Sequence, residues 1–260
     1  HFLTIFKLNK ILSAMKIRLS TLFAAIAAAA VVSCTKHPVQ PEFGIAATDT
    51  LVERNGIACN IEYRFASILN AEDSPALAAI EQANIGYFFE LEAFSGTAQE
   101  AAAAAIGQIA DTYLADSLPA GAAGMEYEIS AESEGTVVDT LVTYTITRSS
   151  FTGGAHGIYG SFNYVYSLVG GYEITLADLF TDTQLDNLDR LIRRKLYEQY
   201  DARDDEGLSA AGFFPEYIGP TENFRVTAES IVFDYNPYEI GCYALGGVEV
   251  EVTREELAGL

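Results

Sequence analysis

The chain has 260 residues, of which 36 are acidic and 15 are basic, and its formal net charge is −21. This composition excludes nucleic acid as a partner, because binding it requires Lys and Arg side chains to neutralise phosphates. Half of the residues are hydrophobic and 12% are aromatic, so the chain can bury a sizeable globular core.

Residues 1–33 predict an export signal. A basic stretch precedes an apolar run over residues 19–32, which is shorter than the roughly 20 residues that cross a bilayer core. The run ends at Ser33 and Cys34, a small residue followed by a cysteine, which is the form that a lipoprotein signal peptidase accepts. We expect cleavage before Cys34 and lipidation of its thiol, with residues 1–14 a mis-called start. The alternative is an ordinary signal with a chance cysteine.

Lipidation predicts a protein that sits on a membrane without crossing it, because acyl chains anchor a chain and do not span the bilayer. The domain would contact the membrane through the lipid anchor only. Thr35 and Lys36 follow the cysteine where an acidic retention signal would stand. We therefore expect the cell envelope as the location, on the outer membrane and facing the periplasm.

The charge left after cleavage is strongly negative. The four basic residues before Cys34 leave with the signal, so 11 basic residues face 36 acidic ones. A field of this sign attracts a basic protein or a cation. The alternative interpretation is that the negative charge serves only to keep the protein soluble.

Residues 34–47 carry two prolines and little pattern, which predicts a lipidated tether ahead of an N-terminal lobe over residues 48–150. Alternating apolar positions predict strands, whereas capping residues predict where helices begin. The expected elements are a strand over 57–66, a helix from 75 to about 85, a helix from 98 to about 116 that stops at 118–121, and strands over 125–133 and 137–149 joined by a turn at Glu134-Gly135.

Residues 151–260 predict a C-terminal domain of the same class. The expected elements are strands over 159–169, 172–175, 224–228, 230–235 and 247–252, and a helix from about 183 to 202. Strands occur in hairpin-linked groups with no regular strand–helix alternation. This pattern predicts an α+β fold of mainly antiparallel sheets, with helices packed on one face and two intimate lobes.

Two cysteines remain after lipidation of Cys34. Cys59 and Cys242 would lie in an oxidising compartment, where a disulfide between the two ends of the domain is one possibility. The other is a pair of buried thiols that behave as small hydrophobic groups.

Motifs of catalysis are scarce in this sequence. Only His37 and His156 follow the signal, so a Ser-His-Asp triad or a multi-histidine zinc site is hard to assemble. The chain has no phosphate-binding P-loop and no nicotinamide fingerprint. We therefore expect no cofactor and no metal, although no spacing among the 36 acidic residues selects or rejects a carboxylate pair.

Two segments stand out as binding candidates. The segment from Gly153 to Gly157 is rich in glycine and carries His156, and residues 236–243 combine an Asn-Pro turn with tyrosines. Tyrosine offers amphipathic contact surface of low entropy, which is typical of binding sites. The structural alternative is a turn between strands in the first case and tyrosines that cover sheet edges in the second.

Together with residues 174–180 and Tyr243-Ala244-Leu245-Gly246, these segments resemble the C-terminal extracytoplasmic domain of the RsiV anti-sigma factor family. A similar arrangement occurs in the non-catalytic region of PdaC-type peptidoglycan deacetylases. The likeness covers about residues 151–260, and residues 43–150 resemble the companion N-terminal domain more faintly. The chain departs from these families because it shows neither a transmembrane sigma-binding segment nor a deacetylase domain.

The resemblance implies a non-catalytic binding module, with lysozyme or a similar basic protein, or peptidoglycan fragments, as the partner. An envelope glycan hydrolase or deacetylase-associated enzyme is the alternative, and a passive assembly lipoprotein is a third reading. The expected binding residues are Gly154, His156, Tyr159, Asn236, Tyr238, Glu239 and Tyr243.

Overall fold

The computed structural model describes residues 37–114 and 126–260, and residues 39–260 form one compact unit. The signal over residues 1–33, the lipidated Cys34 and the helix stop at 118–121 lie outside the described residues. The α+β class is confirmed, with 34% of the described residues helical and 36% in strands. Among the helices of the described ranges, none is both long enough and apolar enough to span a membrane.

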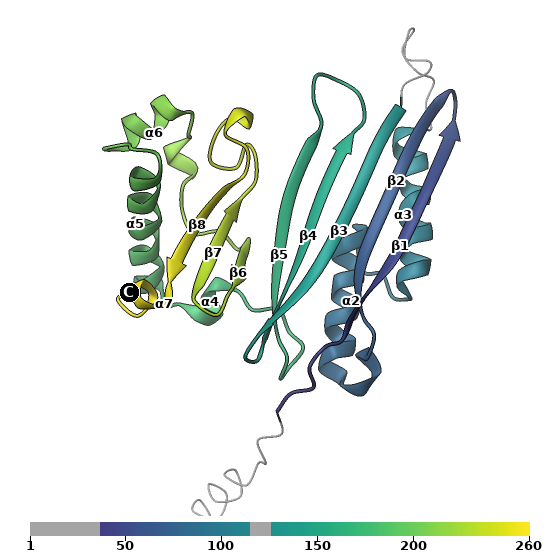
Figure 1. Ribbon diagram of the computed structural model, residues 1–260, viewed down its shortest axis with the longest axis horizontal. Helices are drawn as coiled ribbons and strands as arrows, with labels where there is room; N and C mark the ends of the chain where they lie inside the picture. Colours follow the sequence, from purple (N-terminus) through teal and green to yellow (C-terminus); the bar gives the residue numbers. More distant parts are fainter. Residues whose placement is uncertain (1–36, 115–125) are drawn as a thin grey trace, which may run out of the picture. The chain divides into compact units, whose positions relative to one another are not determined.

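The larger sheet has five strands in chain order (Figure 1). They are β1 Phe43–Arg54, β2 Ile57–Ile68, β3 Glu126–Val138, β4 Leu141–Phe151 and β5 Ile158–Ser167. Neighbouring strands pair antiparallel except β2 and β3, which are parallel. A parallel pair needs a long crossover connection, and the helices between β2 and β3 belong to that connection.

Helices α2 (Pro75–Phe89) and α3 (Ala98–Tyr113) cover one face of this sheet. Ser74 caps α2 by accepting a hydrogen bond from the Ala76 amide, and Thr97 begins α3 with a full capping box. Alternate residues of β2 point toward the helices and are buried, as the period of two predicts. These side chains and the inner faces of the two helices make the first hydrophobic core.

The smaller sheet contains β6 Phe224–Val226, β7 Ser230–Tyr235 and β8 Val248–Thr253, all antiparallel. Helix α5 (Asp182–Gln199) packs on it through an apolar stripe, which forms the second core. The remaining elements are short: η1 Ala71–Asp73, α4 Leu176–Leu179, α6 Asp205–Ala211, η2 Pro215–Tyr217, η3 Tyr243–Leu245 and α7 Arg254–Leu257.

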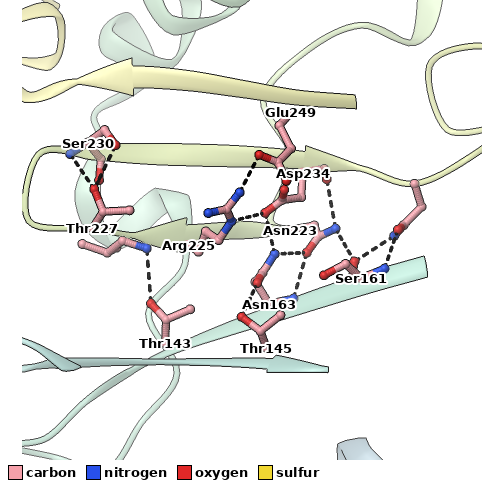
Figure 2. Close-up of polar contacts among 12 residues, drawn as sticks. Thr143, Thr145, Ser161, Asn163, Asn223, Arg225, Thr227, Ser230, Asp234 and Glu249 are labelled. Carbon is pink, nitrogen blue, oxygen red and sulfur yellow. Dashed lines mark hydrogen bonds and ion pairs between the residues drawn. The ribbon is translucent and has the colours of Figure 1, made fainter. Parts of the chain in front are cut away.

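A polar seam joins β5 to the smaller sheet (Figure 2). The Asn163 side chain donates to Asn223 Oδ1 at 2.9 Å and to Asp234 Oδ2 at 2.8 Å, and Arg225 Nε donates to the same Asp234 oxygen at 3.1 Å. Asp234 is only 7% exposed, and burial raises its pKa even though the Arg225 guanidinium lowers it. Because each of these polar groups has a hydrogen-bond partner, the seam fixes the position of the smaller sheet against β5.

Two boundaries differ from the sequence prediction. Strand β1 begins at Phe43, inside the expected tether over residues 34–47. The domain boundary expected between residues 150 and 151 falls at the end of β4, and the sheet continues across it into β5. The domain division at 150/151 therefore does not follow the sheet.

The predicted hairpin turn at Glu134-Gly135 is wrong, because Gly135 lies inside β3 and pairs with Tyr144. A Cβ at Gly135 would stand 2.1 Å from the Phe43 ring, so the glycine makes room for that ring. The chain turns instead at Asp139, which has a positive φ of 55°. Asp tolerates this conformation better than most residues, which explains the displaced turn.

Of the two possibilities for Cys59 and Cys242, the disulfide is not formed, and both cysteines are free thiols. The Cys59 side chain is fully buried in the first core, where burial raises its pKa. A Cβ built on Gly212 would lie 3.0 Å from the Cys242 sulfur, so Cys242 packs against the smaller lobe. The structure therefore agrees with the alternative prediction, in which the two cysteines remain separate thiols.

Candidate functional site

Four of the predicted binding residues meet as an aromatic cluster, which we define as His156, Tyr159, Tyr238 and Tyr243. The His156 ring stacks on the Tyr243 ring with centroids 4.0 Å apart. Tyr238 and Tyr159 approach Tyr243 at 5.5 and 6.0 Å. The Tyr243 hydroxyl donates to the Gly157 carbonyl at 2.9 Å, which ties the residues after β7 to the β4–β5 turn.

The turn from Asn236 to Glu239 positions this cluster. The Glu239 amide donates to the Asn236 carbonyl at 3.0 Å, and a Glu239 carboxylate oxygen accepts from the Asn236 amide at 2.9 Å. The Asn236 side chain reaches β5, where Oδ1 accepts from the Ser161 amide at 2.7 Å and Nδ2 donates to the Ser161 carbonyl at 3.0 Å. The turn is therefore fastened to the strand that follows the His156 segment.

Tyr238 occupies a conformation that glycine normally takes. Its φ is +75°, in the third position of a turn whose second position is Pro237. A bulky residue in this region is a backbone outlier, and such outliers collect at functional sites where surrounding structure holds them in place. The Tyr238 side chain is 56% exposed, so burial does not account for the choice of residue.

A cavity of about 440 Å³ adjoins the aromatic cluster, and we call it the first hollow. It is lined by the ends of α2 and α3, by β3 to β5, and by three of the predicted residues, Tyr159, Asn236 and Glu239. Its volume lies in the range of small-molecule sites, and its mixture of aromatic, apolar and convergent polar side chains is typical of them.

Arg148 lies in the first hollow and was not among the predicted binding residues. Its Nη2 donates to the carbonyls of Tyr87 and Phe88 at the C-terminal end of α2, where a cation suits the helix dipole. Its Nε is 3.6 Å from a Glu90 oxygen, and the guanidinium stands 5.3 Å from the Phe162 ring centroid. One signal was available: Arg148 is the only Lys or Arg between residues 125 and 169.

Tyr63 is another residue of the first hollow that the motif search missed. Burial, together with a smaller contribution from the nearby Glu90 carboxylate, raises its pKa to about 12. The hydroxyl therefore stays protonated at neutral pH and keeps its capacity to donate a hydrogen bond.

Other predicted features lie apart from this site. Gly154 has a φ of +99° and open space where a Cβ would stand, so its positive φ suits the turn. The glutamates of β3 at positions 126, 128, 132 and 134 are exposed to solvent. Within residues 37–114 and 126–260, no group of His, Cys, Asp or Glu side chains is arranged to hold a metal ion.

The C-terminal part of the chain matches a known family model. Residues 177–255 match the model of the DUF3298 family, which is described as a protein of unknown function. No curated protein matches the chain. The comparisons identify neither the RsiV nor the PdaC family, so that finer likeness stays a prediction.

Two solved structures of DUF3298 family proteins share the fold. The first, from Bacteroides fragilis, has a TM-score of 0.77 and 24% identity, covering 86% of this chain and 95% of its own. The second, from Pseudomonas aeruginosa, has a TM-score of 0.61 and 17% identity, covering 85% and 94%. At these identities the likeness shows the fold alone.

Proposed function

We propose that the protein is a lipid-anchored binding protein of the cell envelope, and that the first hollow with its aromatic cluster binds wall glycan. The observation that carries this proposal is the convergence of His156, Tyr238 and Tyr243 beside a hollow of about 440 Å³. Two segments separated by some 80 residues of sequence supply these rings.

The chemistry of the site suits a sugar. Pyranose rings present apolar C–H faces and hydroxyl edges, and an aromatic ring beside polar groups matches both. Tyr159 and Phe162 supply aromatic surface in the first hollow, while Asn236 and Glu239 supply polar atoms at its edge. A hollow with few, well-placed polar groups is the arrangement by which such sites orient a ligand.

A basic protein is the second candidate, and one observation favours it. The sequence carries 36 acidic against 15 basic residues, and a field of this sign speeds the encounter with a basic partner. Lysozyme is the natural probe because it is basic and acts on wall glycan. Its binding would use the acidic surface and would be weakened by salt.

Calorimetry on the purified protein tests the site, with N-acetylglucosamine oligomers and muropeptides as probes and lysozyme in parallel. His156→Ala and Tyr238→Ala are expected to weaken glycan binding at least tenfold. The control Tyr217→Ala removes a tyrosine that is 67% exposed and lies outside the first hollow. Affinity that is indifferent to both site variants would remove the proposed surface.

The enzymatic alternative is decided by incubating the protein with peptidoglycan and analysing the products by mass spectrometry. We expect no new fragments, whereas new fragments would replace the binding proposal with a hydrolase. The predicted lipidation of Cys34 is tested separately, by metabolic labelling with a fatty acid. The label is expected on the wild-type protein and is expected to disappear in Cys34→Ala; an unlabelled wild type would contradict the lipid anchor.

A further inference from the structure

A second hollow continues from the first along the same face of the large sheet. Its volume is about 770 Å³, and α2, the segment after it and β5 line it. Three residues, Glu90, Arg148 and Phe162, line both hollows. The two hollows therefore adjoin each other at the Arg148 side chain, whose guanidinium stands over the Phe162 ring.

The second hollow repeats the chemistry of the first. Tyr87 and Tyr164 stack with ring centroids 4.0 Å apart and an interplanar angle of 12°, next to the polar side chain of Gln82. Burial raises the pKa of Tyr87 to about 12, and its hydroxyl, which donates to Glu173 at 2.9 Å, stays protonated. Aromatic side chains beside polar groups thus line both hollows.

Arg148 keeps one donor group available at this junction. Its Nη2 is used by the α2 carbonyls and its Nε faces Glu90, while Nη1 makes no hydrogen bond within the described ranges. A guanidinium has five N–H donors in a rigid fork, so a donor group remains to reach an acceptor oxygen of a ligand that crosses the junction.

We propose that the two hollows form one binding cleft for a linear glycan several sugars long, with Arg148 as a specificity-determining residue at its middle. This proposal rests on the proposed function of the first hollow. Each hollow alone has the volume of one drug-sized ligand. A ligand that fills both hollows must therefore be longer than a ligand that fills one. Two adjoining hollows of like chemistry match a polymer whose units repeat.

The length of the ligand tests this directly. In calorimetry, the hexamer of N-acetylglucosamine is expected to bind wild-type protein at least about tenfold more tightly than the dimer. Ala79→Trp places a ring in the second hollow from an exposed position of α2. It is expected to remove the advantage of the hexamer and leave dimer affinity unchanged.

Ala78→Trp is the matched control, because Ala78 is the exposed neighbour of Ala79 on α2 and lines neither hollow. It is expected to keep the advantage of the hexamer, and thermal melting of both variants verifies that they fold. Arg148→Lys is expected to weaken the hexamer more than the dimer, since lysine lacks the planar fork.

Equal affinity for dimer and hexamer in the wild type would overturn the two-hollow cleft and leave the first hollow standing. A preserved length effect in Ala79→Trp would overturn the placement in the second hollow. If neither oligomer binds, the proposed function fails together with this inference. Tight binding of a peptide or an acyl chain in the second hollow would replace the glycan there.

Discussion

The Asn236 side chain pairs with the Ser161 backbone in the way a neighbouring strand would. Oδ1 accepts from the Ser161 amide at 2.7 Å while Nδ2 donates to the Ser161 carbonyl at 3.0 Å. This pairing joins the turn after β7 to the edge of β5 and brings Tyr238 and Tyr243 beside the His156 segment. A Cβ at Gly160 would lie 3.0 Å from Asn236 Oδ1, so β5 is shaped to receive the amide.

Asn236→Ala is expected to lower the free energy of unfolding by about 1–2 kcal/mol, because both Ser161 groups lose a partner. It is also expected to weaken glycan binding, since the turn that carries Tyr238 is released. Urea denaturation measures the first effect and calorimetry the second. Asn60→Ala is the control, because Asn60 is exposed and its side chain makes no hydrogen bond within the described residues. Equal stability of the two variants would contradict the fastening role of Asn236.

Tyr238→Gly is expected to separate stability from binding. Relief of the φ of +75° stabilises the fold by roughly 0.5–1 kcal/mol, while loss of the ring weakens glycan binding. Tyr217→Gly is the contrast, because Tyr217 is also exposed but has no positive φ, and it is expected to destabilise. If Tyr238→Gly destabilised as much as Tyr217→Gly, the backbone at position 238 would not be strained.

Asp234 predicts a pH dependence of stability with a definite sign. Burial raises its pKa in the folded state above the ordinary value of 3.8, so at a pH between these two values the folded protein holds a proton that the unfolded chain has released. Its contribution is fully present below that ordinary value and is lost as the pH rises through the folded pKa. The stability of Asp234→Asn relative to wild type is therefore expected to be highest at pH 7 and to decline toward pH 4.

Denaturation of both proteins across that pH range measures this difference, and other carboxyl groups cancel in the comparison. A relative stability that stays constant, or that rises toward pH 4, would contradict the raised pKa of Asp234. The seam of Figure 2 supplies the internal control: Asn163→Ala removes one donor to Asp234 and is expected to raise the carboxyl pKa further.

Gly135→Ala is expected to destabilise the protein by about 1–3 kcal/mol, because a Cβ would stand 2.1 Å from the Phe43 ring. The same substitution in a Phe43→Ala background is expected to cost less, since the obstructing ring is gone. A double-mutant cycle in urea measures this coupling. If the two substitutions lowered the free energy of unfolding additively, the Phe43 ring would not be the reason that position 135 requires a glycine.

Much of the fold could be predicted from local patterns. The alternation of Ile57 to Phe65, the cap at Ser74 and the capping box at Thr97 each report a local interaction, and the structure contains the elements they predict. Gly135 led to the wrong turn prediction because a glycine is needed there to make room for the Phe43 ring. That ring is distant in sequence, and no local pattern reveals it. Strand β1 was not predicted at all for the same reason, since its pairing with β2 defines it.

The candidate site shows the same division. The motifs identified His156, Asn236 and Tyr243 as residues of interest. In the structure the rings of His156 and Tyr243 stack, and the Asn236 side chain pairs with Ser161 of β5. Arg148 was missed because its importance depends on the end of α2, about 60 residues away.

The most direct test is an NMR titration of the protein with the N-acetylglucosamine hexamer. It follows the side-chain signals of Asn236 and Arg148 and the rings of His156 and Tyr243. These signals are expected to shift together and saturate at one ligand concentration, while those of exposed Asn60 stay in place. Saturable binding that leaves all four unchanged, or no binding of the hexamer, would contradict the assignment of this cleft.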